Sequence, residues 1–363
     1  MTSADSLKRN GQEFLKGISD VSFYSCKNNS LESLIKKINI DSVYDNRDLL
    51  SEEIFEVEYP HISKQSEMYI EEFRKFKKSL EDKFNWVYFP WDKKLVACLS
   101  DDLHYRLITA RNRNMVTKEE HELLRRVNIG IIGLSVGQSS ALSLVGAGIS
   151  RNLKLADFDT LSGSNLNRLD GGIDEIGLIK THLVGRRILK LNPYYNLKFY
   201  EEPISKDNLG DFLLSDFKLD FVIDAFDSIS AKITLRRLAK KHGITVVMGT
   251  DIGNGVLLNI ETPKDQIFFG VLPENEIDKI ENGEKLTLVE LSQIVPKILA
   301  LEKYPERFMG HIISMSKKEI PWMSQLRLAS SLTGVFVTYA IKQIVLGNKI
   351  NNKVFLNLEE IIK

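Results

Sequence analysis

The amino-acid sequence predicts an α/β protein: a Rossmann-like, mostly parallel β-sheet with flanking helices and an antiparallel extension of the sheet toward the C-terminus. Apolar runs short enough for buried parallel strands alternate with helix-like segments between residues 127 and 248. A glycine-containing turn follows the first of these runs, and acidic residues follow two later ones. Ligands of open parallel sheets bind beyond the carboxyl ends of the strands. The same pattern therefore predicts which edge of the sheet carries the site.

A βαβ unit is predicted at the centre of this sheet. It consists of a strand over residues 127–132, the turn Gly133-Leu134-Ser135-Val136-Gly137, a helix over residues 139–146 and a strand over residues 153–156. The free N–H groups at the start of such a helix bind phosphate. We expect Gly133, Ser135 and Gly137 to form a nucleotide-binding turn.

Acidic residues follow the second strand of this unit. Asp157 and Asp159 come directly after it, and Asp157 lies 24 positions beyond Gly133. That spacing is typical of the carboxylate that binds ribose hydroxyls in dinucleotide-binding folds. The sequence therefore predicts that Asp157 and Asp159 belong to the nucleotide site.

A second pair of acids, Asp224 and Asp227, ends a strand predicted over residues 220–224, and two cations, Arg168 and Lys180, precede it. Asp227 offers an oxygen ligand for Mg²⁺, the ion that accompanies ATP. An oxidoreductase has no use for this combination of charges. A phosphoryl or nucleotidyl transfer enzyme needs all of it, because its catalysis consists mainly of positioning and charge neutralisation.

The remaining elements are predicted from periodicity and from turn residues. Helices are expected over residues 177–191, 229–242 and 323–346, and strands over residues 197–200, 244–248, 256–260, 266–271 and 353–358. The charged residues 273–320 are predicted to be partly helical and to form a mobile crossing segment.

An N-terminal accessory region is predicted over residues 1–105, before an adenylation-type domain over residues 106–363. Residues 1–80 are expected to be helical. The aromatic segment 85–91 contains a proline and predicts an edge strand, paired as a hairpin with residues 95–99.

Composition narrows the class of protein. The 363 residues carry 49 Lys plus Arg and 49 Asp plus Glu, so no net charge attracts nucleic acid or an anionic membrane. No segment resembles a signal peptide or reaches the length of a membrane span. The two cysteines, Cys26 and Cys98, form no metal-spaced pair. A cytoplasmic protein that binds neither nucleic acid nor membrane is expected.

Four motifs occur in a fixed order: Asp157-Phe158-Asp159, Ser164-Asn165-Leu166-Asn167-Arg168, Gly177-Leu178-Ile179-Lys180 and Asp224-Ala225-Phe226-Asp227-Ser228. Over residues 106–260 the sequence resembles the E1-like ThiF/MoeB/HesA adenylyltransferase family. It is most similar to a branch with a Gly-Leu-Ser-Val-Gly turn, whose members are sometimes fused to nitroreductase-like domains.

This resemblance implies ATP and Mg²⁺ as cofactors and a role for each matching residue. Asp157 would bind the ribose, Asn165 would orient the phosphates, and Arg168 and Lys180 would stabilise charge on the α-phosphate. Asp227 would hold Mg²⁺. Arg113, or its neighbour Arg111, would reach the γ-phosphate across a homodimer interface. The acceptor would be the carboxylate of a small protein or a small molecule, converted to an acyl-adenylate with release of pyrophosphate.

The sequence departs from the family pattern at three points. The turn contains Ser135 in place of a glycine and is one residue shorter than usual. The Cys-x-x-Cys pairs of a structural zinc site are absent, so no zinc is predicted. No cysteine follows Cys98, which excludes transfer of the acyl group through a downstream thiol of this chain.

Two other functions remain open from the sequence. A non-catalytic nucleotide-binding or scaffold protein would explain the altered turn, and an NAD(P)-dependent oxidoreductase could use the same βαβ unit. Asp251 and Asn254 follow a predicted strand; either a substrate contact or ordinary turn chemistry explains them.

Overall fold

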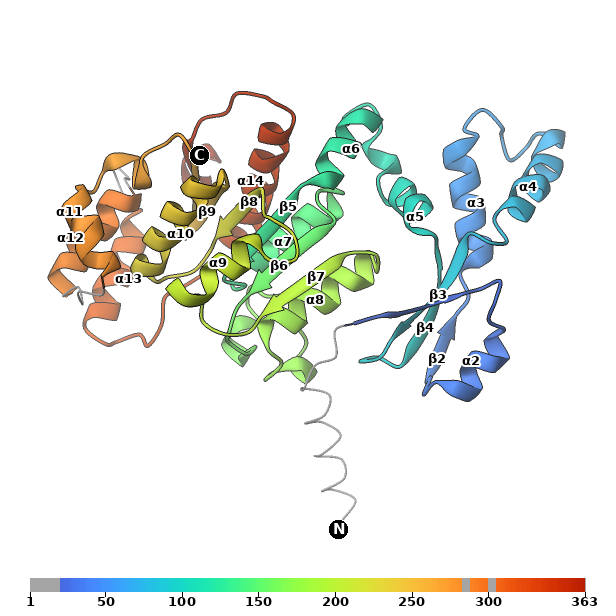
Figure 1. Ribbon diagram of the computed structural model, residues 1–363, viewed down its shortest axis with the longest axis horizontal. Helices are drawn as coiled ribbons and strands as arrows, with labels where there is room; N and C mark the ends of the chain where they lie inside the picture. The colour runs from blue at the N-terminus through green and yellow to red at the C-terminus, as the bar shows by residue number, and fades with distance from the viewer. Residues whose placement is uncertain (1–19, 283–287, 300–304, 363) are drawn as a thin grey trace, which may run out of the picture. The chain divides into compact units, whose positions relative to one another are not determined.

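The computed structural model describes residues 20–282, 288–299 and 305–362 (Figure 1). The chain divides into two compact units. The first comprises residues up to His121 together with Ile188–Tyr194, and the second comprises Glu122–Arg187 and the residues from Tyr195 onward. Each unit is described by itself.

The second unit is built on a seven-stranded sheet with the order β11-β10-β9-β8-β5-β6-β7. Its strands are β5 (Asn128–Ile132), β6 (Asn152–Ala156), β7 (Asn196–Tyr200), β8 (Phe221–Asp224), β9 (Thr245–Ile252), β10 (Gly255–Glu261) and β11 (Lys353–Asn357). Five neighbouring strands, in the spatial order β9-β8-β5-β6-β7, are parallel. β10 and β11 extend the sheet antiparallel beyond β9. The predicted fold class is confirmed, including the antiparallel C-terminal extension.

Helices cover both faces of this sheet. They are α7 (Gly137–Gly146), α8 (Lys180–Leu191), α9 (Lys206–Leu214), α10 (Ile229–His242) and α14 (Arg327–Val345). Val222 of β8 packs with Phe212 of α9 and Leu235 of α10 in one apolar cluster. On β9, Gly249 faces Thr333 of α14, and its neighbour Met248 faces the opposite side, toward α10. Because side chains alternate along a strand, α10 and α14 lie on opposite faces.

Close packing between α7 and α14 fixes one of these layers. A Cβ at Gly334 would lie 2.5 Å from the carbonyl oxygen of Ser139. A Cβ at Gly249 would lie 2.4 Å from a methyl carbon of Thr333. Small residues therefore let α14 approach both α7 and the sheet, and α7 is the helix that follows the nucleotide-type turn.

The helix α14 is, among the described residues, the one helix long and apolar enough to cross a membrane, so the expectation that no segment reaches this length is wrong. Of its most apolar stretch, 44% is buried, because α14 packs against α7, β9 and β10. This burial identifies α14 as a core helix of the second unit.

The prediction of a strand over residues 266–271 is wrong. The structure has a 3₁₀ turn there, η4 (Ile267–Gly270), with Phe268 and Phe269 at φ 48° and 55°. The Phe268 N–H donates to Oε2 of Glu261 at 2.8 Å, and its ring packs 4.2 Å from the guanidinium of Arg236. A buried ring and a side-chain acceptor therefore favour a tight turn over an extended strand.

The crossing segment that follows η4 is helical in part, as predicted. It contains α11 (Glu274–Glu281), α12 (Leu288–Leu299) and α13 (Glu306–Ser316). Residues 283–287 and 300–304 of the predicted segment lie outside the described residues. Buried side chains of α11 and α12, including Ile277 and Ile298, pack in one cluster with Phe268 and Met248.

The first unit contains a four-stranded sheet with the order β1-β3-β4-β2. Its elements are β1 (Ser22–Ser25), α2 (Leu31–Lys37), β2 (Ser42–Tyr44), α3 (Arg47–Glu58), α4 (Glu67–Ser79), β3 (Phe84–Phe89), β4 (Lys94–Leu99), α5 (Asp101–Ile108) and η1 (Ala110–Asn112); α6 (Lys118–Arg126) leads into the second unit. The hairpin of β3 and β4 is confirmed.

Two expectations for this region are wrong. β3 is an inner strand, because β1 pairs with it on the side away from β4, and the proline follows the strand at position 90. The region expected to be helical contributes strands β1 and β2 as well as helices. These strands have four and three residues, too few to show a clear alternation. Residues 1–19 lie outside the described part.

We expect Gly334→Ala to lower the free energy of unfolding by about 1–3 kcal/mol, because its Cβ would clash with backbone rather than with a flexible side chain. Denaturant unfolding of the full chain measures this. Gly146→Ala is the matched control on α7, since nothing lies within 4 Å of its added Cβ. Equal effects of the two substitutions would contradict the close-packing argument.

Candidate functional site

The carboxyl ends of four neighbouring parallel strands form one edge of the second unit. The turn at residues 133–137 follows β5, Asp157 follows β6, Asp227 follows β8, and Asp251 lies near the end of β9. This is the edge at which open parallel sheets bind ligands. The strand order places these residues on adjacent strands, although up to 118 positions separate them in sequence.

The turn after β5 requires glycine at its first position. Gly133 has φ 87°, and a Cβ there would lie 2.1 Å from the carbonyl oxygen of Ala225. Its N–H donates to the carbonyl of Ala156 at 2.8 Å, which closes the turn against β6. Gly137 begins α7, and its Cβ would lie 2.8 Å from Ile131. Both glycines are therefore fixed by close contacts.

Asp157 ties β6 to this turn. Oδ2 accepts from the N–H of Leu134 at 2.7 Å, and Oδ1 accepts from the N–H of Asp159 at 2.9 Å. The side chain is 7% exposed, and this burial raises the pKa of the carboxyl. Lys180 Nζ, 3.9 Å away, opposes that rise. The residue predicted to bind ribose thus also shapes the turn.

Lys180 joins the two acids. It is the first residue of α8, is 5% exposed, and its Nζ donates to Oδ2 of Asp159 at 2.8 Å. Its backbone N–H donates to the carbonyl of the same residue at 2.9 Å. The structure therefore brings Lys180, Asp157 and Asp159 together as the sequence predicted, with Asp159 the more exposed carboxylate.

Arg168 is connected to the turn through Ser135. Its Nε donates to Oγ of Ser135 at 3.1 Å, and its Nη1 donates to Oδ1 of Asn167 at 2.9 Å. Burial lowers the pKa of the guanidinium, and Asp251 opposes that shift. The serine that replaces a glycine of the family pattern is therefore a hydrogen-bond partner of the predicted phosphate-binding arginine.

A segment before α14 is fastened to the same loops. Ser135 Oγ donates to Oε1 of Gln325 at 3.3 Å, and Asn167 Nδ2 donates to the carbonyl of Gln325 at 2.8 Å. Arg327 pairs with Asp170. Sequence patterns could not predict these contacts, because their partners lie more than 150 positions apart.

The other predicted site residues have different surroundings. Asn165 caps the short turn η2 (Gly163–Asn165), with Oδ1 accepting from the N–H of Ser162 at 3.1 Å. Asp227 is exposed just beyond β8. One carboxylate together with substrate phosphates is a usual donor set for Mg²⁺, so Asp227 fits that ion. Arg113 lies in the first unit, after η1, and its approach to a nucleotide stays a prediction.

The described residues contain no group of three or more His, Cys, Asp or Glu side chains arranged to hold a metal.

Asp224, the other acid of its motif, is part of the core. It is fully buried and pairs with Lys232 and with Nη1 of Arg236, the latter at 2.7 Å. Arg236 Nε also pairs with Oε1 of Glu261 at 2.6 Å. Burial acts to raise the pKa of Asp224, but the two cations hold it below its ordinary value. Of the two acids ending β8, only Asp227 remains available to a ligand.

Asp251, unlike Asp224, has no cation paired with its carboxylate among the described residues. Its Oδ1 accepts from Oγ1 of Thr333 on α14 at 2.6 Å, while its buried Oδ2 has no hydrogen-bond partner. Burial raises the pKa of this carboxyl to about 6, with Thr333 and Arg168 opposing the rise. Asp251 belongs to β9, so turn chemistry does not explain it. Strongly perturbed carboxyls at a sheet edge are candidates for functional groups.

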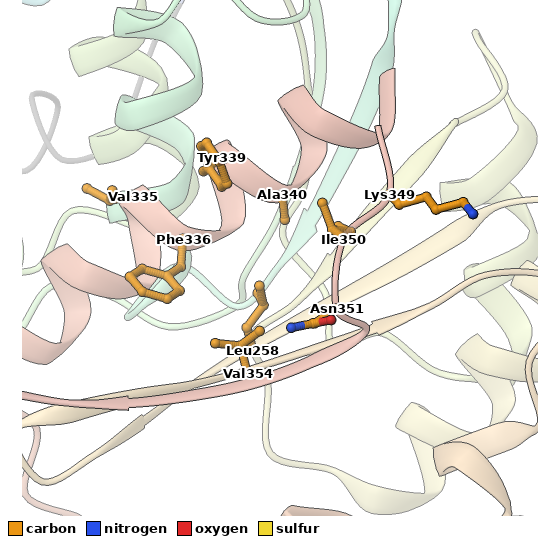
Figure 2. A pocket seen from close by; sticks show the side chains of 9 residues that line it. All are labelled: Leu258, Val335, Phe336, Tyr339, Ala340, Lys349, Ile350, Asn351 and Val354. Carbon is orange, nitrogen blue, oxygen red and sulfur yellow. The ribbon is translucent and has the colours of Figure 1, made fainter. Parts of the chain in front are cut away.

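A separate cavity of about 710 Å³ opens between α14 and the antiparallel strands. Figure 2 shows Val335, Phe336 and Tyr339 of α14 on one side, and Leu258 and Val354 on the other. None of the predicted site residues lines it.

The fold and the turn define the second unit as a Rossmann-like α/β domain with a phosphate-type turn. The ThiF family model matches residues 109–356, and the chain belongs to the ThiF family. The ThiF family membership predicted from the four motifs is therefore confirmed.

Relatives support the same assignment. MT1398 of Mycobacterium tuberculosis (strain CDC 1551 / Oshkosh) is 32% identical over 278 residues, which cover 75% of this chain and 38% of that protein. The tRNA threonylcarbamoyladenosine dehydratase of Haemophilus influenzae (strain ATCC 51907 / DSM 11121 / KW20 / Rd) is 31% identical over 135 residues, 37% of this chain and 51% of that protein. The chain thus spans about half the length, or less, of these relatives.

Among solved structures, the Escherichia coli tRNA N6-threonylcarbamoyladenosine dehydratase in complex with AMP is similar, with a TM-score of 0.49 and 16% identity. The similarity covers 68% of this chain and 97% of that one.

We expect Asp251→Asn to stabilise the protein at neutral and alkaline pH. The pKa of the folded carboxyl is about 6 against an ordinary 3.8, so ionisation costs stability as the pH rises through this range. The variant should gain up to about 3 kcal/mol at pH 8 and nothing near pH 4, at about 1.4 kcal/mol per pKa unit. Denaturant unfolding across this pH range measures the difference. Asp207→Asn, on the exposed first turn of α9, is the control; a pH-independent gain at Asp251 would refute the argument.

Proposed function

We propose that this chain is an ATP-dependent adenylyltransferase that converts a carboxylate into an acyl-adenylate and releases pyrophosphate. The observation that carries the proposal is the meeting of four groups at one sheet edge: the turn at Gly133, the carboxylate of Asp157, and the cations Lys180 and Arg168. Their order along the chain is that of the family to which it belongs.

Each group has a part in the reaction. The N–H groups at the start of α7 and the side chain of Arg168 bind the phosphates, and Asp157 binds the ribose. Asn165 helps to orient the phosphates. Asp227 holds Mg²⁺, which adds positive charge beside the triphosphate when it is bound.

The acceptor carboxylate attacks the α-phosphate in line with the departing pyrophosphate. Lys180 and Arg168 then lie where negative charge develops. The carboxylate is already ionised at neutral pH, so the step needs no general base.

The acyl group passes to an external nucleophile. The chain has two cysteines, and both belong to the first unit. Burial raises the pKa of the Cys26 thiol to about 11 and that of Cys98 to about 12. Since the thiolate is the nucleophilic form, neither cysteine is prepared to form a thioester at neutral pH.

The assembly follows from the same proposal. Arg113 would complete the phosphate site from the partner in a homodimer, and the acceptor is a small protein or a small-molecule carboxylate. A cytoplasmic location stays a prediction from the sequence.

The altered turn is also compatible with a second function, that of a nucleotide-binding scaffold protein without catalysis. Intact ATP binding and intact cellular function in a variant carrying both Arg168→Ala and Lys180→Ala would favour it. Titration with NADH and with ATP separates the proposal from an NAD(P)-dependent oxidoreductase, and we expect ATP to bind more tightly.

We expect Lys180→Met and Arg168→Lys each to lower kcat by about 10²–10³-fold, the usual effect of removing a group that stabilises transition-state charge. ATP–pyrophosphate exchange measures this, once an acceptor supports turnover. Lys198→Met is the matched control, because Lys198 is a half-exposed lysine of β7 paired with Asp216. Full exchange in the Lys180 and Arg168 variants would refute their proposed roles.

Ser135 is predicted to position Arg168. Ser135→Ala removes the acceptor of the Arg168 Nε–H, worth about 1.5–3 kcal/mol for a bond to a charged group. We expect kcat to fall about tenfold or more with little change in KM for ATP, and Ser135→Thr to restore most of it. A change confined to KM, or no rescue by threonine, would argue against positioning.

A further inference from the structure

The carboxylate of Asp251 lacks a cation of its own. No ion pair within 4 Å involves it among the described residues, and Thr333 satisfies only one of its oxygens. The Thr333 hydroxyl has a single hydrogen and also lies 3.0 Å from the carbonyl of Ala329, so even this bond is shared. Buried carboxylates are normally paired. Asp224, on the neighbouring strand, has two cations.

Arg168 is a cation close to Asp251, but its hydrogen bonds go to other residues. Its positive charge acts to lower the pKa of Asp251, yet its hydrogen bonds go to Ser135, Asn167 and the carbonyl of Ser164. A negative and a positive side chain therefore lie near one another without touching. A ligand with both charges can satisfy them together.

If the chain adenylates a carboxylate, this arrangement of charges discriminates between acceptors. The inference below therefore rests on the proposed function. The acceptor carboxylate must approach the α-phosphate beside Arg168 and Lys180. An ionised Asp251 near Arg168 repels a plain carboxylate. An ammonium group in the same acceptor reverses the sign of that interaction, because opposite charges attract strongly where water is partly excluded.

We propose that Asp251 selects an acceptor that carries an ammonium group close to its carboxylate, as an amino acid does. The acceptor carboxylate lies toward Arg168 and its ammonium toward Asp251, with Thr333 holding the Asp251 carboxylate in place. Asp251 is then a specificity-determining residue, and no proton or bond changes at it during adenylation. Such sites reject a ligand that leaves their buried polar group unpaired.

The test is ATP–pyrophosphate exchange with the full chain and matched pairs of acids. Each proteinogenic amino acid is compared with its desamino analogue, for example phenylalanine with 3-phenylpropionate and alanine with propionate. The wild type should exchange with at least one amino acid and at least about tenfold more slowly with its analogue. Asp251→Asn should reduce this preference by about tenfold or more, because it removes the charge and keeps the shape.

Controls separate this inference from the proposed function. Asp207→Asn makes the same charge change on exposed α9 and should keep the wild-type preference. Unfolding measurements establish that Asp251→Asn is folded. Two results overturn the inference and leave adenylation standing. One is equal wild-type exchange with amino acids and their desamino analogues, and the other is an unchanged preference in Asp251→Asn. Exchange with no amino acid, while ATP is bound, overturns this inference and leaves adenylation of another carboxylate standing. Loss of ATP binding together with no exchange for any acceptor overturns adenylation as well.

Discussion

The two hydrogen bonds accepted by Asp157 are the interaction on which the site depends. The bond from Leu134 joins the end of β6 to the turn after β5, and the bond from Asp159 holds the loop that follows β6. Both oxygens accept best when the carboxylate is ionised, and Lys180 supplies the opposing charge. The conformation of the turn is thus set by a charge on the next strand as well as by glycine. This explains how a turn with Ser135 in place of a glycine keeps a defined shape.

Two buried carboxylates on neighbouring strands show how charge is divided between stability and ligand binding. Asp224 is surrounded by Lys232 and Arg236, and this pairing links β8 to α10 and, through Glu261, to β10. Asp251 has only the hydroxyl of Thr333 as a hydrogen-bond partner, and the nearby guanidinium of Arg168 does not touch it. Its incomplete pairing costs stability at neutral pH, a cost typical of groups retained for function.

The sequence was sufficient for the parts of the fold that have a local signal. Periodicity gave the strands and helices around the βαβ unit, and the order of four short motifs gave the family. Contacts between distant positions had no such signal. Nothing local distinguishes Asp224 from Asp227, because their roles differ through Lys232 and Arg236, which lie 8 and 12 positions after Asp224 and are brought to it by α10. The strained turn at Phe268 likewise depends on a side chain of β10.

The candidate site was predictable to the same extent. Asp157, Lys180 and Arg168 were found because their spacing is a family pattern, whereas Gln325 and Thr333 reach the site only through α14 and the segment before it. That segment bonds to the turn through Ser135, which also bonds Arg168. A glycine at position 135 could make neither side-chain bond. The serine therefore joins three parts of the chain around an arginine that the proposed reaction needs, and its departure from the family pattern is a reason to expect a well-oriented guanidinium.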